Sequence, residues 1–84
     1  METNQWVKKV AKAYVLLNAE LSSEPDVMKS LKMIDEVKEA HTVYGVYDII
    51  ARIEADTMAD LKEIISWKIR RISEIRSTLT MIAI

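Results

Sequence analysis

Apolar and polar residues alternate along two segments of the chain, with the period of two that is typical of half-buried β-strands. In residues 12–21 every odd position is apolar. The same is true from Tyr47 to Ala55, where Asp48, Arg52 and Glu54 lie on the opposite side. The pattern therefore predicts strands over residues 12–21 and 47–55, each with one wholly apolar face.

Each of these strands is followed by apolar residues at helical spacing. After "SSEPD", where Ser22 or Ser23 can cap a helix and Pro25 suits its first turn, the spacing predicts a helix that ends near Asp35. Thr57 and the acidic residue three positions later resemble a capping box, and an apolar stripe continues to Ile72. We expect this second helix to end at about Arg71.

Two further strands complete the chain and define its fold class. β-Branched and aromatic residues indicate strands over 37–44 and 75–84, so the order of elements is βαββαβ. Two βαβ halves joined at Gly45-Val46 predict a ferredoxin-like α+β fold, an antiparallel four-stranded sheet with both helices on one face. The two-residue joint with Gly45 first predicts a type II′ hairpin turn.

The opposite face of this sheet is expected to be uncovered and partly apolar. We place the following residues there: Tyr14, Leu16, Asn18, Asp48, Ile50, Arg52, Glu54, Thr78, Thr80, Ile82 and Ile84. Apolar area left open on a sheet is stabilised when a second copy covers it. The sequence therefore predicts a homodimer that packs sheet against sheet.

Composition limits the domain count and the classes of function. Eighty-four residues form one small domain, which we divide into an N-terminal arm (1–11) and a folded domain (12–84), and half of the residues are hydrophobic. The net charge of −1 gives no broad positive field for nucleic acid. Cysteine is absent and no apolar run approaches membrane length, so we expect a cytoplasmic protein without disulfides.

The only glycine, Gly45, lies beside the residues that are the best candidates for a ligand site. Asp48 follows Tyr47 directly after the turn, where a carboxylate can accept hydrogen bonds from a ligand ammonium while loop N–H groups bind a carboxylate. A solvated turn explains the same residues without a ligand. Spacing alone leaves both interpretations open.

Three motifs resemble the effector-binding domain of the Lrp/AsnC (feast/famine) transcription regulators. The Gly-x-Tyr-Asp segment matches at Gly45, Tyr47 and Asp48, the acidic-Thr cap of the second helix at 56–57, and the Thr-x-Thr segment of the last strand at Thr78 and Thr80. The resemblance covers residues 12–84. Eleven residues before the first strand are too few for a helix-turn-helix, so the chain resembles the stand-alone form of this domain, the RAM module.

The resemblance implies a small-molecule sensor that does not bind DNA directly. In such proteins homodimers assemble into rings, here an octamer or a decamer, and an amino acid or related metabolite binds between dimers. Gly45, Tyr47 and Asp48 would bind the ligand, with the hydroxyls of Thr78 and Thr80 completing the site. The module would act by joining full-length Lrp/AsnC-type regulators, and no cofactor is implied.

Two alternatives share the same order of elements. Small dimeric α+β-barrel enzymes, such as monooxygenases and isomerases, use this fold. However, His41 is the only histidine, and no nucleophile or catalytic residue stands beside it at a suitable spacing. The second alternative is the ACT regulatory domain, which binds amino acids at domain interfaces. Without cysteine or a histidine cluster, no metal site is expected.

Overall fold

The computed structural model describes residues 10–84, and over this range the elements follow the predicted order βαββαβ. Their bounds are β1 (Ala11–Ala19), α1 (Glu24–Lys32), β2 (Val37–Thr42), β3 (Ile49–Ala55), α2 (Met58–Ile64), the π-helical segment η2 (Ile65–Ile69) and β4 (Ile75–Ala83). The predicted N-terminal arm falls mainly on residues 1–9, outside the described residues. Its last residue, Ala11, already belongs to β1.

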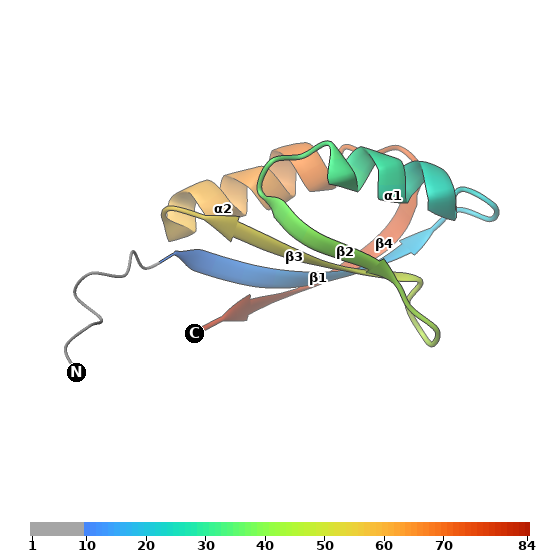
Figure 1. Cartoon of the computed structure of the whole chain (residues 1–84), viewed down its shortest axis with the longest axis horizontal. Coiled ribbons are helices and arrows are strands. Elements are labelled where there is room, and N and C mark those ends of the chain that lie inside the picture. Colours follow the sequence, from blue (N-terminus) through green and yellow to red (C-terminus); the bar gives the residue numbers. More distant parts are fainter. Residues whose placement is uncertain (1–9) are drawn as a thin grey trace.

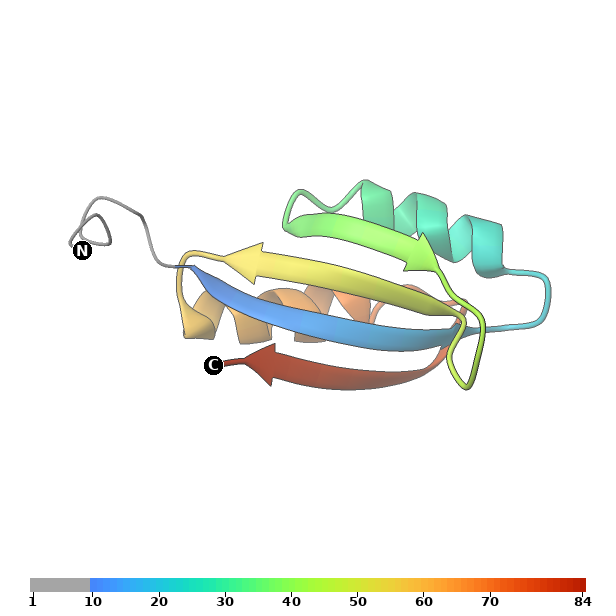
Figure 2. The same ribbon diagram turned by 60° about the horizontal axis from the view of Figure 1, so that its bottom comes forward.

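The strands form one antiparallel sheet in the order β2-β3-β1-β4. Both helices cover the same face of this sheet (Figure 1), and Figure 2 shows the four strands side by side. α1 packs against β2 and β3, and α2 packs mainly against β1 and β3. The ferredoxin-like prediction is confirmed, including one face covered by helices and one left open.

The core lies between the helices and the two central strands. Burial alternates along β1 and β3 as predicted, because every second side chain of a strand points to the same face. Fully buried side chains of this kind contribute about 1.5–3 kcal/mol each. They include Val15, Leu17, Val27, Leu31, Ile49, Ile53, Leu61 and Ile69.

The start and end of α1 differ from the prediction. Ser23 is the residue before the first turn, but its side chain makes no capping hydrogen bond, and Ser22 is in the left-handed region with φ 67°. Pro25 lies in the first turn as expected. The helix ends at Lys32 and not near Asp35, because the last N–H groups bond three residues back, Met33 to Ser30 and Ile34 to Leu31.

The second helix begins as predicted and continues with a change in geometry. The Thr57 hydroxyl accepts a hydrogen bond from the Asp60 N–H at 3.1 Å, which satisfies one of the free donors of the first turn. From Ile65 the helix widens into η2, and the Arg70 N–H donates to the Ile65 carbonyl five residues back at 3.1 Å. The helical path therefore ends close to the predicted Arg71, and its last turn is a π-segment of the kind often found at functional sites.

The connection between β2 and β3 is longer than the predicted two-residue turn. β2 ends at Thr42 and β3 begins at Ile49, and the six-residue loop between them is closed by a hydrogen bond from the Val43 N–H to the Asp48 carbonyl at 2.8 Å. Tyr47 and Asp48 are therefore loop residues. Gly45 has a φ of +155°, which other residues rarely adopt, so the turn does need glycine although its type was wrong.

The faces of β4 are opposite to the prediction. Tyr14 lies opposite Met81 and Leu16 opposite Leu79, so the open face of β4 is formed by Ser77, Leu79, Met81 and Ala83. Thr78, Thr80 and Ile82 lie opposite the buried Leu17, Val15 and Ala13 and point to the helix side. Ile84 lies beyond the strand. α2 packs mainly over β1 and β3, so Thr78 and Thr80 on this edge strand are only half-buried.

Candidate functional site

The loop that contains Gly45 projects from one end of the sheet (Figure 2). Its tip exposes Tyr44 and Val46, the residues on either side of the glycine. A Cβ atom added to Gly45 would meet no atom within 4 Å. Glycine is therefore needed at this position for its backbone conformation and not to make room for a neighbour.

Asp48 ties this loop to the end of β1. Its Oδ2 atom accepts a hydrogen bond from the Ala19 N–H at 3.1 Å, and its own N–H donates to the Leu17 carbonyl at 2.9 Å. The side chain is half-buried. The Oδ2 atom thus has a structural role. The other oxygen, Oδ1, makes no hydrogen bond within the described residues, so it is the atom that a ligand ammonium would contact.

The five predicted ligand residues do not meet in one hollow of a single chain. Thr78 lies opposite Leu17 and Thr80 opposite Val15, so β1 separates both from β3 and from the loop that holds Gly45, Tyr47 and Asp48. Both threonines also point to the helix side. The register therefore places the two threonines and the glycine loop on strands that are not neighbours.

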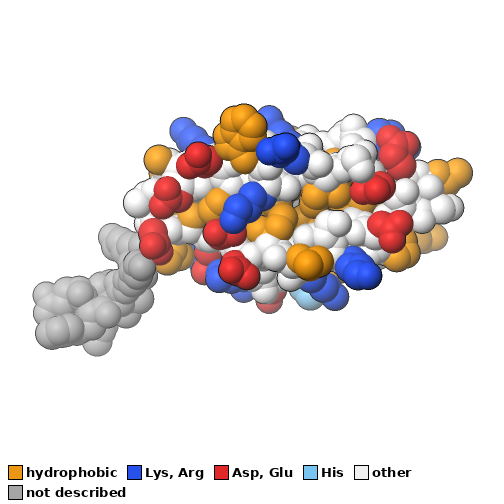
Figure 3. All heavy atoms as spheres, turned by 90° about the horizontal axis from the view of Figure 1, so that it is seen from above, with side chains coloured by type: hydrophobic (Ala, Val, Ile, Leu, Met, Phe, Trp, Pro, Cys, Tyr) orange, Lys and Arg blue, Asp and Glu red, His pale blue; other side chains and the backbone are white. Residues whose placement is uncertain are grey.

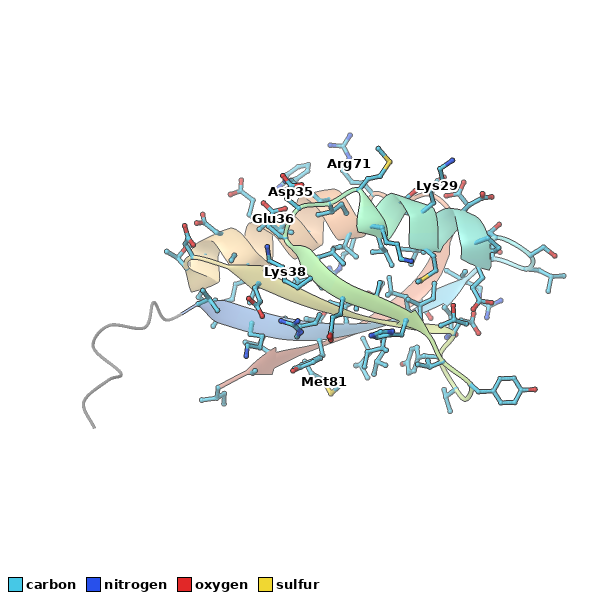
Figure 4. The ribbon with its side chains drawn as sticks, viewed as in Figure 1. Lys29, Asp35, Glu36, Lys38, Arg71 and Met81 are labelled. Carbon is cyan, nitrogen blue, oxygen red and sulfur yellow. The ribbon has the colours of Figure 1, made fainter. Side chains whose placement is uncertain are left out.

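A groove of about 530 Å³ lies at the other end of the molecule, between α2, η2 and the beginning of β2. Figure 4 shows Asp35, Glu36 and Lys38 along this side. None of the five predicted ligand residues lines the groove, whose lining is Asp35, Glu36, Lys38, Glu54, Ala55, Asp56, Asp60, Glu63, Ile64, Trp67 and Lys68. Six carboxylates against two lysines make it acidic.

An ion pair crosses this groove. The Lys68 ammonium donates to Oε1 of Glu36 at 3.2 Å and joins η2 to the turn before β2. A hydrogen bond from its own backbone N–H and the contact with Lys68 lower the pKa of the Glu36 carboxyl below its ordinary value of 4.5, against the opposing effect of burial. On the rim, the Arg71 guanidinium lies over the exposed Trp67 ring, 5.8 Å from its centroid.

A second, smaller hollow of about 240 Å³ lies between α2–η2 and β4. We call it the edge pocket, and it is lined by Lys62, Ile65, Ser66, Arg70, Thr80 and Ile82. The hydroxyl oxygen of Thr80 is shielded from solvent and has no hydrogen-bond partner among the described residues. A buried polar group without a hydrogen-bond partner lowers the free energy of unfolding by about 1–3 kcal/mol, so such groups are uncommon in folded proteins.

The open face of the sheet is divided into a charged and an apolar part. Towards β2, Arg52 contacts Glu39, its partner across the strands, and Glu54. The hydrogen bond to Glu39, at 3.3 Å, raises the pKa of the Arg52 guanidinium. His41 lies opposite Ile50 on this face. The apolar part, which we call the open apolar face, consists of Tyr14, Leu16, Ile50, Leu79 and Met81.

Two residues of the open apolar face are almost half exposed, Leu79 at 45% and Met81 at 48%. Figure 4 shows Met81 below the sheet, on the side away from the helices. In the space-filling view of the helix side, charged side chains surround the apolar ones (Figure 3). Leu79 and Met81 lie opposite Leu16 and Tyr14 in the register, so the exposed apolar residues of the sheet face are neighbours.

Within residues 10–84, no group of three or more His, Asp or Glu side chains is arranged to hold a metal ion. In the same range no helix is long and apolar enough to cross a membrane.

A βαββαβ domain with one open sheet face and a glycine loop tied to its central strand belongs to the class of ferredoxin-like α+β domains. The model of the Lrp/AsnC ligand binding domain matches residues 12–84. The chain therefore belongs to the Lrp/AsnC family, as the resemblance of its motifs indicated.

Three relatives show how close this relationship is. The regulatory protein AsnC of Haemophilus influenzae is 40% identical over 57 residues, which cover 68% of this chain and 38% of AsnC, so the chain spans well under half of that relative. The crystal structure of FFRP-DM1 superposes with a TM-score of 0.85 at 46% identity, covering 88% of this chain and 99% of the other. The protein PHS023 of Pyrococcus horikoshii gives a TM-score of 0.84 at 46% identity, with 90% of each chain covered.

Proposed function

We propose that this chain is a regulatory module that binds an amino acid or a related small metabolite and acts as an assembly of identical subunits. The match of residues 12–84 to a ligand-binding domain of transcription regulators carries this proposal. The same membership argues against the α+β-barrel enzyme alternative. The ACT alternative loses its support because the family model that matches is a different one.

The first step of the assembly is a homodimer formed through the open apolar face. Apolar side chains on adjacent strands leave a surface that water disfavours, and its burial contributes roughly 25 cal/mol per Å². The charged pairs around Arg52 and Glu39 form its border towards β2. A stable interface usually combines an apolar centre with such a polar rim, so this face suits a second copy of itself.

The effector site is completed where dimers meet in a larger ring, an octamer or a decamer. Gly45, Tyr47 and Asp48 come from one chain, and Thr78 and Thr80, which β1 separates from them, come from a neighbour. The free carboxylate oxygen of Asp48 accepts from the ligand ammonium, while loop N–H groups bind its carboxylate. A charge-assisted hydrogen bond of this kind contributes about 1.5–3 kcal/mol.

Calorimetric titration with the twenty amino acids tests the ligand class. For an amino acid that binds, Asp48→Asn should lower the affinity about 10- to 100-fold, because the amide keeps an acceptor for the Ala19 N–H but loses the charge that pairs with ammonium. The control is Asp35→Asn, which removes a carboxylate far from the loop and should leave the affinity unchanged. An equal affinity in the Asp48→Asn variant would remove this residue from the site.

The module is proposed to act in the cytoplasm by joining full-length Lrp/AsnC-type regulators, and not by binding DNA itself. Regulators with the same sheet face or the same ring contacts would form mixed assemblies with this chain. Because the effector binds the assembled form, it would change the size of these assemblies. Co-purification with a regulator from the same cell, with and without the amino acid that binds, tests this. Failure to recover any regulator in either condition would contradict it.

A further inference from the structure

We propose that the edge pocket is a second ligand site, which binds the carboxylate of a small organic acid that has no ammonium group, such as a branched 2-oxo acid. This site shares Thr80 with the proposed amino-acid site and none of that site's other residues. It is built entirely from one chain, so it does not depend on the assembly.

The pocket exists because the helix leaves the inner side of the edge strand uncovered. Lys62, Ser66 and Arg70 are spaced four apart along α2 and its continuation, so they follow one side of the helical path. Thr80 and Ile82 are two apart on β4 and point to the same side of the sheet. The helix packs mainly against β1 and β3, and the hollow is the space left between it and β4.

The lining is positively charged and its charges are not neutralised. Lys62 and Arg70 make no ion pair within the described residues, and no acidic side chain lines the pocket. In contrast, Arg52 and Lys68 elsewhere on the domain are paired with glutamates. Two unpaired cations on one hollow favour an anion, and the planar guanidinium of Arg70 can bind both oxygens of a carboxylate.

The orphan hydroxyl provides independent evidence for a ligand. The Thr80 oxygen is shielded from water and has no partner in residues 10–84, although buried polar groups are almost always hydrogen-bonded. Ser66 supplies a second hydroxyl on the opposite wall. An anion held between the two cations would give the Ser66 hydroxyl an acceptor, and a rotation of the Thr80 side chain about χ1 would bring its hydroxyl to the same anion.

Size and polarity narrow the ligand class. The volume of about 240 Å³ lies below the range of roughly 300–1,000 Å³ that is usual for drug-sized ligands, so a molecule with few heavy atoms is expected. Ile65 and Ile82 give the pocket an apolar part, which suits a short branched chain. An ammonium group would lie beside two cations with no carboxylate to balance it, so the amino acid of the same skeleton is disfavoured.

Calorimetric titration of the purified protein with 3-methyl-2-oxobutanoate, and in parallel with valine and inorganic phosphate, tests the proposal. The 2-oxo acid should bind, and Lys62→Gln and Arg70→Gln should each weaken it at least tenfold. Lys32→Gln, the same charge change on α1, should have no effect. Thr80→Val should weaken binding several-fold without lowering the unfolding midpoint, because its hydroxyl bonds nothing in the free protein.

Four results would overturn the proposal: no binding of the 2-oxo acid, affinities that Lys62→Gln and Arg70→Gln leave unchanged, valine binding equally well at this site, or phosphate displacing the acid at equal concentration. The two sites are separated by their variants. Asp48→Asn should leave binding of the 2-oxo acid intact, and Arg70→Gln should leave binding of an amino acid at the glycine loop intact, so either proposal can fail alone.

Discussion

Asp48 has a structural role that its sequence position does not reveal. Its carboxylate accepts a hydrogen bond from the Ala19 N–H at the end of β1, and its backbone N–H donates to the Leu17 carbonyl. This one residue therefore connects the glycine loop to the central strand. The same carboxylate is the proposed partner of a ligand ammonium. Binding and folding therefore depend on the same side chain, and the two effects have to be separated by the choice of substitution.

Asp48→Ala should lower the free energy of unfolding by about 1–2 kcal/mol, because it leaves the Ala19 N–H without its acceptor. Asp48→Asn should lower the free energy of unfolding by less than half of that amount, since the amide oxygen still accepts the hydrogen bond from the Ala19 N–H. Urea unfolding followed by circular dichroism measures both values. Equal stability of the alanine variant and the wild type would show that this hydrogen bond does not hold the loop.

Residue identities predicted the candidate loop but not the orientation of the threonines. Gly45, Tyr47 and Asp48 were identified from their own chemistry and from a family motif. Thr78 and Thr80 were placed on the open face because β4 mixes threonine with apolar residues and has no clean alternation. Their true direction follows from the register with β1, a long-range property that the strand's own sequence does not contain.

At the scale of elements, regular patterns were predictable and connections were not. The central strands β1 and β3 keep a strict alternation, so their bounds and faces came close to the observed ones. The predicted hairpin turn was wrong, since the loop length depends on the hydrogen bonds from Asp48 to β1. The π-segment η2 also has no signal in the apolar stripe. Lys62, Ser66 and Arg70 are four apart in the sequence and belong to none of the three family motifs.

The Glu36–Lys68 ion pair is a contact between elements that pH should switch. Because the folded-state pKa of Glu36 lies below 4.5, its carboxylate stabilises the fold above pH 4.5, and this contribution is lost as the pH falls through the lowered pKa. The free-energy difference between wild type and Glu36→Gln should therefore be constant at neutral pH and disappear in acid. Unfolding measured across this pH range checks the expectation.

Lys68→Gln provides the second half of this test. With the lysine removed, part of what lowers the glutamate pKa is gone, so the Glu36→Gln difference should become smaller and should vanish at a higher pH. A difference that does not depend on pH, in either background, would contradict the assigned cause.

At the scale of the whole molecule, the decisive feature is the asymmetry of the sheet. One face is filled by two helices, and the other exposes Leu79 and Met81 together with Tyr14. The open face was predicted from the order of elements, and Tyr14, Leu16, Asn18, Ile50, Arg52 and Glu54 were placed on it correctly, whereas Asp48 lies in the loop before β3. On β4 the predicted Thr78, Thr80, Ile82 and Ile84 are exchanged for Ser77, Leu79, Met81 and Ala83, so this part of the open face keeps its apolar character.

Sedimentation velocity of the purified protein at micromolar concentration tests the central claim, that this face joins two subunits. The wild type should sediment with at least twice the chain mass of 9.7 kDa. Met81→Lys should shift it towards a single chain, whereas Met33→Lys, the same change at an exposed methionine after α1, should not. A wild-type protein that sediments as one chain, or an assembly that Met81→Lys leaves intact, would contradict the account.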